Sequence, residues 1–269
     1  MRRLTSEEKN KIKLLVKEGV SLNKISKVMH LSKTTVYYHF RRLKGMTIKR
    51  PRIHFDSKRE LGEVIGLFAG DGSLHFEPKN YGYLIRVHFG IDNVGYLNHV
   101  KSLYEKNFGK IFNAKSDGKG NLIIETKSKD IFLFFHDFLN FKNQEKALTV
   151  SLKNKYENHN EFLIGFLKGL LDTDGTICST ADKQLRIVFY TSSKKLSEQI
   201  SKYLRSFNIS HDISEDRRGE NISYHIYILK KSIDGIINLL RPFWAGRSTV
   251  ETTPDSSLPR SLPLVTEKA

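Results

Sequence analysis

The 269-residue sequence lacks several features that mark particular classes of protein. Its single cysteine, Cys178, excludes a disulfide framework within the chain and suits a reducing compartment. No stretch approaches the roughly 18 uncharged apolar residues of a membrane-spanning helix, and no apolar signal core follows Met1. We therefore expect no membrane partner, and a location in the cytoplasm or, for an organelle-encoded protein, in the stroma or matrix.

Acidic residues are scarce in the first fifty positions, where 14 Lys and Arg accompany 3 Asp and Glu for a net charge of +11. The whole chain carries +16, so residues 51–269 are nearly balanced at +5. Such an excess favours a polyanionic partner, most often nucleic acid, although basic ribosomal and membrane-surface proteins share it. The distribution predicts a small basic module at residues 1–50, with a basic linker at Lys44 to Arg52, and a larger, more balanced region after it.

Three helix-start signals fall within this basic module. Ser6, Ser21 and Ser32 are expected N-caps, and Gly19 is expected to end the first helix. The pattern over residues 5–45 resembles a helix-turn-helix of the resolvase or transcription-regulator kind, whose third helix would enter the major groove of DNA. The residues that would contact bases or phosphates are Lys33, Thr34, Thr35, Tyr38, His39, Arg41 and Arg42. The alternative is a three-helix bundle with a solvated basic face and no role in DNA binding.

Two similar stretches lie 103 residues apart in the rest of the chain. Val64 to Gly72 and Leu167 to Gly175 are both apolar, glycine-containing and helical in pattern, and both end in Asp-Gly. One such ending is a common helix terminus. Two copies suggest two related helices that each deliver one carboxylate, Asp71 and Asp174, to a pseudo-two-fold site.

The segments that follow each stretch repeat in the same order, which indicates an internal duplication. In the first half we expect strands at 83–90 and 121–127 and helices at 96–108 and 131–139. In the second half we expect strands at 185–190 and 222–230 and helices at 196–207 and 233–240. Lys127 and Lys230 both follow their aspartates by 56 residues. The predicted order in each half is therefore helix, two strands, helix, two strands, helix.

These motifs resemble the LAGLIDADG homing endonucleases of the single-chain, two-motif type, over about residues 58–250. The second motif fits closely through Leu167, Gly169, Asp172, Asp174 and Gly175. The first departs from the pattern, with Ala69 and Gly70 in place of aspartate and alanine. The resemblance implies an α+β fold of tandem αββαββα half-domains at residues 58–145 and 161–250, joined by a connector at 146–160. The small all-α module would precede them, and an extended tail at 251–269 would follow.

The resemblance also implies a metal-dependent nuclease site. Gly66 and Gly169 would form the helix interface that brings the two aspartates together, and like charges in one small volume favour a cation between them. Hard oxygen ligands select Mg²⁺ or a similar ion such as Mn²⁺. Asp71 and Asp174 would be catalytic metal ligands, with the carbonyls of Gly70 and Thr173 as further ligands.

A basic residue near the metal is also implied by the resemblance. Lys142 falls where the first half would place it, Arg247 is the nearest substitute in the second half, and Lys127 and Lys230 are rivals. Strand residues would contact double-stranded DNA through the major groove. These DNA-binding candidates are Arg86, His88, Arg186, Tyr190, His225 and Tyr227, together with Lys127 and Lys230.

The resulting hypothesis is a monomeric, site-specific endonuclease that makes a double-strand break during the homing of an intron or mobile element. One alternative is a transcription regulator on the same fold that binds DNA without cutting it. A second is an RNA-splicing maturase. The retained aspartates favour the enzyme, and the chain shows no splicing-domain signature of an intein.

Overall fold

The computed structural model describes residues 4–44, 50–78, 82–90, 94–116, 118, 120–142, 145–179, 184–218 and 222–243. These residues divide into two compact units, Met1–Arg50 and Pro51–Ala269. The expected tail at 251–269 and the residue Arg247 lie outside the described ranges, as does most of the basic linker. None of the described helices has the length and apolar character needed to cross a membrane.

The described part of the first unit, residues 4–44 and 50, contains three helices, α1 (Ser6–Lys17), α2 (Leu22–Val28) and α3 (Lys33–Lys44). The N-cap of α1 is Thr5 rather than the expected Ser6, because the Thr5 hydroxyl accepts from the Glu8 N–H while the Glu8 carboxylate accepts from the Thr5 N–H. Ser21 caps α2, and the Ser32 hydroxyl accepts from the Thr35 N–H at the start of α3. The small core is formed by Leu4, which precedes α1, and by apolar side chains from all three helices: Ile12, Val16, Ile25, Val36 and Phe40.

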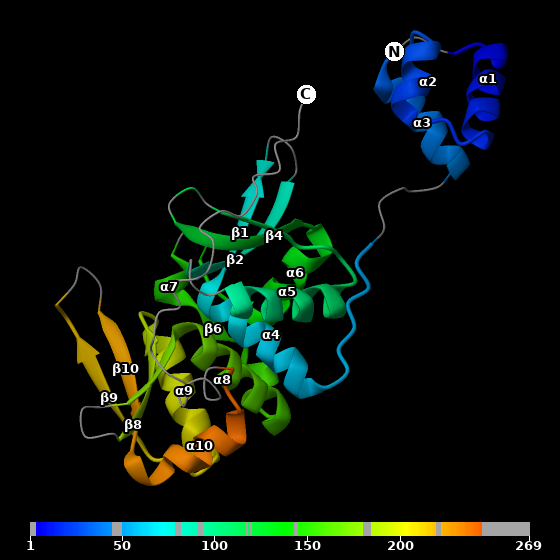
Figure 1. The fold of residues 1–269 in the computed structure, drawn as a ribbon. Coiled ribbons are helices and arrows are strands. Elements are labelled where there is room, and N and C mark those ends of the chain that lie inside the picture. The colour runs from blue at the N-terminus through cyan, green and yellow to red at the C-terminus, as the bar shows by residue number, and fades with distance from the viewer. Residues whose placement is uncertain are drawn as a thin grey trace, which may run out of the picture. The chain divides into compact units, whose positions relative to one another are not determined.

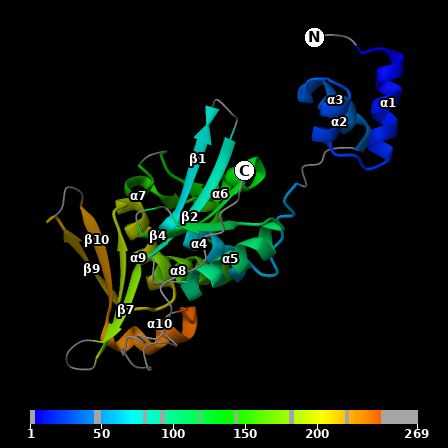
Figure 2. The ribbon, with the colours of Figure 1, turned by 45° about the horizontal axis from the view of Figure 1, so that its top comes forward.

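The second unit contains the duplicated pattern as two sets of elements (Figures 1 and 2). The first set is α4 (Lys58–Asp71), β1 (Gly72–Glu77), β2 (Gly82–Gly90), α5 (Val94–Phe108), β3 (Asn113–Ser116), β4 (Asn121–Lys127) and α6 (Lys129–Phe138). The second set is α8 (Asn160–Asp174), β7 (Gly175–Ser179), β8 (Leu185–Thr191), α9 (Lys194–Ser206), β9 (His211–Asp216), β10 (Ser223–Ile228) and α10 (Ile233–Leu240). The predicted α+β fold class is confirmed.

Each set forms an antiparallel four-stranded sheet with the same topology, β1-β2-β4-β3 in the first and β7-β8-β10-β9 in the second. One face of each sheet is apolar and is covered by the helices of its own half. In β2, for example, Ile85, Val87 and Phe89 are buried while Arg86 and His88 on the opposite face are partly open. This alternation has the period of two that a half-buried strand requires.

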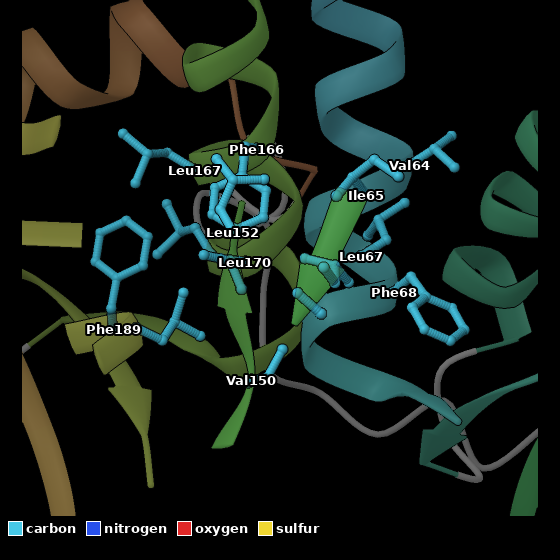
Figure 3. Close-up of a cluster of buried hydrophobic side chains, with 14 of the residues drawn as sticks. Val64, Ile65, Leu67, Phe68, Val150, Leu152, Phe166, Leu167, Leu170 and Phe189 are labelled. Carbon is cyan, nitrogen blue, oxygen red and sulfur yellow. The ribbon is translucent and has the colours of Figure 1, made fainter. Parts of the chain in front are cut away.

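The segment between the halves is more structured than a plain connector. It holds β5 (Leu139–Asn140), α7 (Lys146–Thr149), β6 (Ser151–Leu152) and the 3-10 helix η2 (Asn154–Tyr156). Strand β6 is fixed by Gln199 of α9, whose side chain bonds both the N–H and the C=O of Leu152. Figure 3 shows Val150 and Leu152 beside the α4 and α8 side chains in the shared core. This anchoring gives α7 a defined place at the end of α4.

Candidate active site and DNA-binding surface

Helices α4 and α8 lie side by side and form the main contact between the two halves (Figures 1 and 3). The structure places Gly66 and Gly169 opposite one another, and a Cβ built on Gly66 would overlap the carbonyl oxygen of Phe166 and lie 3.1 Å from the Gly169 Cα. Only a residue without a side chain permits this backbone approach. The close packing directs both helix C-termini to the same place.

Two further glycines belong to this interface and were missed in the sequence. A Cβ on Gly62 would overlap the Phe162 carbonyl oxygen, and one on Gly165 would overlap the Arg59 carbonyl oxygen. Gly62 lies four residues before Gly66 on α4, and Gly165 lies four residues before Gly169 on α8. That four-residue spacing places both glycines of a helix on one face, and it is the signal that could have identified them.

Asp71 and Asp174 are the last residues of α4 and α8 and lie close together. A Cβ built on Gly70 would lie 3.2 Å from the Oδ2 atom of Asp174, so the end of one helix touches the carboxylate of the other. Burial and the nearby Asp174 raise the pKa of Asp71 to about 7, although Lys146 opposes this shift. Burial raises the pKa of Asp174 to about 6, again against the influence of Lys146. The two carboxylates therefore repel one another in a poorly hydrated volume.

The basic group beside this pair is Lys146, not the predicted Lys142. The Lys146 Nζ atom donates to the Gly70 carbonyl oxygen at 2.5 Å and lies 5.7 Å from the centre of the Phe68 ring. Burial lowers the pKa of Lys146 to about 8, whereas Asp174 and Asp71 act to raise it. Lys142 instead has a side chain that is 76% exposed and lies 3.6 Å from the Glu145 carboxylate.

The path of the chain after α6 explains why Lys146, and not Lys142, lies beside the aspartates. Lys142 was the expected basic residue because of its position along the sequence. The chain beyond α6, however, forms the short strand β5 and then the helical turn α7. Lys146 is the first residue of α7, and this turn places it against the end of α4. The intervening backbone path is set by long-range contacts, which spacing alone does not reveal.

The residues at the helix ends fit a small, hard cation. Two buried carboxylates and the Gly70 carbonyl supply oxygen atoms, and the Lys146 ammonium already marks a cation position on that carbonyl. Within the described residues there is no group of three or more His, Cys, Asp or Glu side chains suited to hold a metal. Mg²⁺ commonly takes one or two carboxylates and completes its shell with water or phosphate oxygens, so two aspartates suffice.

Thr173 lines one side of this arrangement, and its hydroxyl donates back to the Gly169 and Leu170 carbonyls of its own helix.

Asp172, one residue earlier, is buried, and both of its carboxylate oxygens accept hydrogen bonds from within the protein. Its Oδ1 accepts from the Phe243 N–H at 2.8 Å, and its Oδ2 accepts from Lys168 at 2.9 Å. Lys168 also donates to Glu63 of α4 at 2.5 Å, so this ion network joins the two halves beside the aspartate pair.

Two cavities adjoin Asp71, which lines both. One of about 570 Å³ opens towards the first sheet and is lined in part by Ser73, Arg86, His88 and Lys146. The other, of about 360 Å³, is lined in part by Tyr96, Asp172, Thr173 and Thr176. The first carries basic side chains and can accept an anionic group next to the carboxylates.

The open face of the first sheet carries several of the predicted DNA-binding residues. Arg86 lies opposite Ser73 on β1 and Glu125 on β4, and its Nε donates to the Glu125 carboxylate at 3.0 Å. His88 Nε2 lies 3.2 Å from the Ser73 hydroxyl. Lys127 lies opposite Leu84 in register, so it shares this face.

The open face of the second sheet brings together Arg186 and three aromatic residues. Tyr190 and His225 are opposite one another in register, and their rings meet edge to face at 4.8 Å. The His225 Nδ1 atom lies 3.2 Å from the Tyr227 hydroxyl, and Arg186 is exposed on β8. The structure therefore places all four on one surface.

Lys230 does not lie on this face. It begins the 3-10 helix η3 (Lys230–Ser232), two residues beyond the end of β10 at Ile228. Lys127 is by contrast the last residue of β4. The second half inserts a helical turn before α10, so the shared 56-residue spacing does not mark equivalent positions.

In the first unit, the predicted contact residues lie on α3. Lys33, Thr34, Tyr38, Arg41 and Arg42 are exposed, while Thr35 and His39 are half-buried. The Tyr38 side chain is 66% exposed, although it is a large aromatic residue. This basic, aromatic helix face remains available to a polyanion.

Comparison with known proteins agrees with this architecture. Residues 161–233 match the family model described as a LAGLIDADG-like domain, and residues 1–43 match that of a helix-turn-helix domain. No curated protein matches the sequence.

Solved structures of homing endonucleases are similar in fold to 68% of this chain. Mesophilic variants of the homing endonuclease I-DmoI match with a TM-score of 0.52 and 16% identity, over 68% of this chain and 95% of that chain. I-DmoI in complex with DNA and Mn matches at 0.51 and 17%, over 68% and 96%. An I-DmoI variant with its target DNA in the presence of Mg matches at 0.52 and 16%, over 68% and 96%. The resemblance found in the sequence is confirmed.

Proposed function

We propose that this protein is a divalent-metal-dependent endonuclease that makes a double-strand break at a long DNA site during the homing of an intron or mobile element. The observation that carries the proposal is the meeting of Asp71, Asp174 and Lys146 at the ends of two glycine-packed helices. The I-DmoI structures with DNA and with Mn or Mg lend support through the shared fold. We expect a monomer, because one chain supplies both halves of the site.

Each component of the site has a defined task in this proposal. Asp71 and Asp174, with the carbonyls of Gly70 and Thr173, would hold Mg²⁺ or Mn²⁺. When bound, the ion supplies Lewis-acid stabilisation of charge on the phosphate and lowers the pKa of water. Lys146 would place its positive charge beside the reacting phosphate, in the basic cavity.

The two sheet faces and the first unit would supply affinity and specificity. The Arg86 and Lys127 face and the Arg186, His225 and Tyr227 face would contact the major groove, where base edges are distinguishable. The exposed residues of α3 would add contacts to bases and phosphates. Lys230, beyond β10, would contribute at most a peripheral phosphate contact.

The test separates cutting from binding. Purified protein is incubated with a randomised DNA library and Mg²⁺, and the cut and bound fractions are sequenced. Asp71→Asn and Asp174→Asn should abolish cutting and leave binding largely intact, while Lys142→Met should cut like the wild type. Selective binding with no cutting under any divalent metal would favour a regulator, and undiminished cutting by either aspartate variant would refute the assigned roles.

A further inference from the structure

The position of Lys146 has a consequence for how the site takes up metal. Its ammonium nitrogen donates to the Gly70 carbonyl oxygen at 2.5 Å, and the carboxylates of Asp71 and Asp174 act on its charge. The three groups that interact with this ammonium are thus three of the four proposed metal ligands. The inference rests on the proposed function, because that function assigns the ligands.

We propose that Lys146 and the divalent ion compete for the same oxygens, so that metal binds by displacing the Lys146 ammonium from the Gly70 carbonyl. A Mg²⁺ ion needs its ligand oxygens at about 2.0–2.1 Å, and Mn²⁺ favours the same hard carboxylate, carbonyl and water oxygens. Two cations on one carbonyl would lie within a few ångströms of each other at a site with little water, where their repulsion is weakly screened. One of them has to leave.

The adjoining cavity provides the place for the displaced side chain. Lys146 lines the cavity of about 570 Å³ that is also lined by Arg86 and His88. Rotation about the side-chain bonds of Lys146 would move its nitrogen off Gly70 and into that space. There the ammonium meets the anionic group that the basic walls attract, so metal uptake and delivery of Lys146 to a phosphate become one event.

The same geometry explains how two buried carboxylates coexist. Asp71 and Asp174 repel each other, and Lys146 is the cation that offsets this repulsion within the described residues around them. Removing the charge at position 146 therefore leaves a more negative set of oxygens with no competitor. Such a site should bind a divalent ion more tightly, at some expense in the stability of the protein.

The experiment measures Mn²⁺ binding to the full chain without DNA, by electron paramagnetic resonance of the free ion or by calorimetry. Lys146→Met should bind Mn²⁺ at least about tenfold more tightly than the wild type, a coupling within the usual range for two linked sites. Lys142→Met removes the same charge from an exposed neighbour on the same segment, and should change the affinity by less than about twofold. Equal or weaker binding by a folded Lys146→Met protein would overturn the competition.

A second measurement uses the unmodified protein. An amine-reactive reagent followed by mass spectrometry should label Lys146 poorly without metal and several-fold faster with saturating Ca²⁺, while the labelling of Lys142 stays constant. No change at Lys146 in a protein that demonstrably binds the ion would overturn the displacement and leave the nuclease proposal intact. Absence of any divalent binding by wild type and variants would overturn both.

Discussion

Replacing Asp71 with asparagine should make the metal-free protein more stable while removing cleavage. The Asp71 carboxyl is largely buried next to Asp174, and these surroundings raise its pKa from 3.8 to about 7. The folded state therefore keeps a proton that the unfolded state releases at lower pH. Stability present below the unfolded pKa is lost as the pH rises through the folded pKa, in the window from about pH 4 to pH 7.

The size of the loss follows from the shift. About three pKa units at about 1.4 kcal/mol each give about 4 kcal/mol between those limits. Asparagine keeps the shape of the side chain without the charge, but it gives up the attraction to Lys146. We therefore expect Asp71→Asn to raise the free energy of unfolding at about pH 8 by roughly 2–4 kcal/mol, with less pH dependence than the wild type.

The assay is urea unfolding in the presence of a chelator at several pH values between about 4 and 8. Asp212→Asn is the matched control, since Asp212 is exposed on β9, and it should stay within about 0.5 kcal/mol of the wild type. Mg²⁺ at ten times its dissociation constant should stabilise the wild type by about 1.4 kcal/mol and the Asp71→Asn variant by much less. An Asp71→Asn protein that is no more stable at pH 8, with an unchanged pH profile, would refute the assumed repulsion.

Three further predictions concern the scaffold and the basic unit. Gly66→Ala should destabilise the protein by about 1–3 kcal/mol in urea unfolding, because the added Cβ overlaps the Phe166 carbonyl. Gly235→Ala on α10 is the control: its added Cβ meets only ordinary contacts, so it should stabilise the protein by up to about 1 kcal/mol. Lys168→Met should cost about 3–5 kcal/mol in the same assay, because it removes the cation that the buried Asp172 shares with Glu63, and a loss below about 1 kcal/mol would contradict that view. Arg41→Ala combined with Arg42→Ala should lower the slope of log affinity against log salt by about two, measured by fluorescence anisotropy on duplex DNA, and an unchanged slope would remove α3 from the DNA contacts.

The fold could be predicted from the sequence because the patterns that indicate its helices and strands are local and occur twice. The strand at 83–90 alternates with a period of two, and the strand at 185–190 is rich in β-branched and aromatic residues. The helices at 96–108 and 196–207 repeat their apolar residues at helical spacing, as the structure shows. For these elements the structure changes only the boundaries, and the first N-cap moves from Ser6 to Thr5. Local hydrogen bonding and side-chain periodicity determine such elements, so they can be predicted from the amino-acid sequence.

The positions of the two aspartates were likewise available from the sequence, since each closes a repeated apolar helix with Asp-Gly. The backbone approach that joins them needed glycine on both helices, and Gly66 and Gly169 indicated it. Gly62 and Gly165 permit the same close approach a turn earlier, and only the packed helices showed that four glycines form the contact.

The tertiary structure alone decided which basic residue accompanies the aspartates. Lys142 and Lys146 lie in the same polar segment, with nothing in their neighbours to separate them. The outcome depends on β5, β6 and α7, whose placement comes from contacts with Gln199 and the α4–α8 core far away in sequence. No pattern within the segment indicates long-range packing of this kind. The sequence by itself therefore determined the two carboxylates, and the tertiary structure determined which lysine lies beside them.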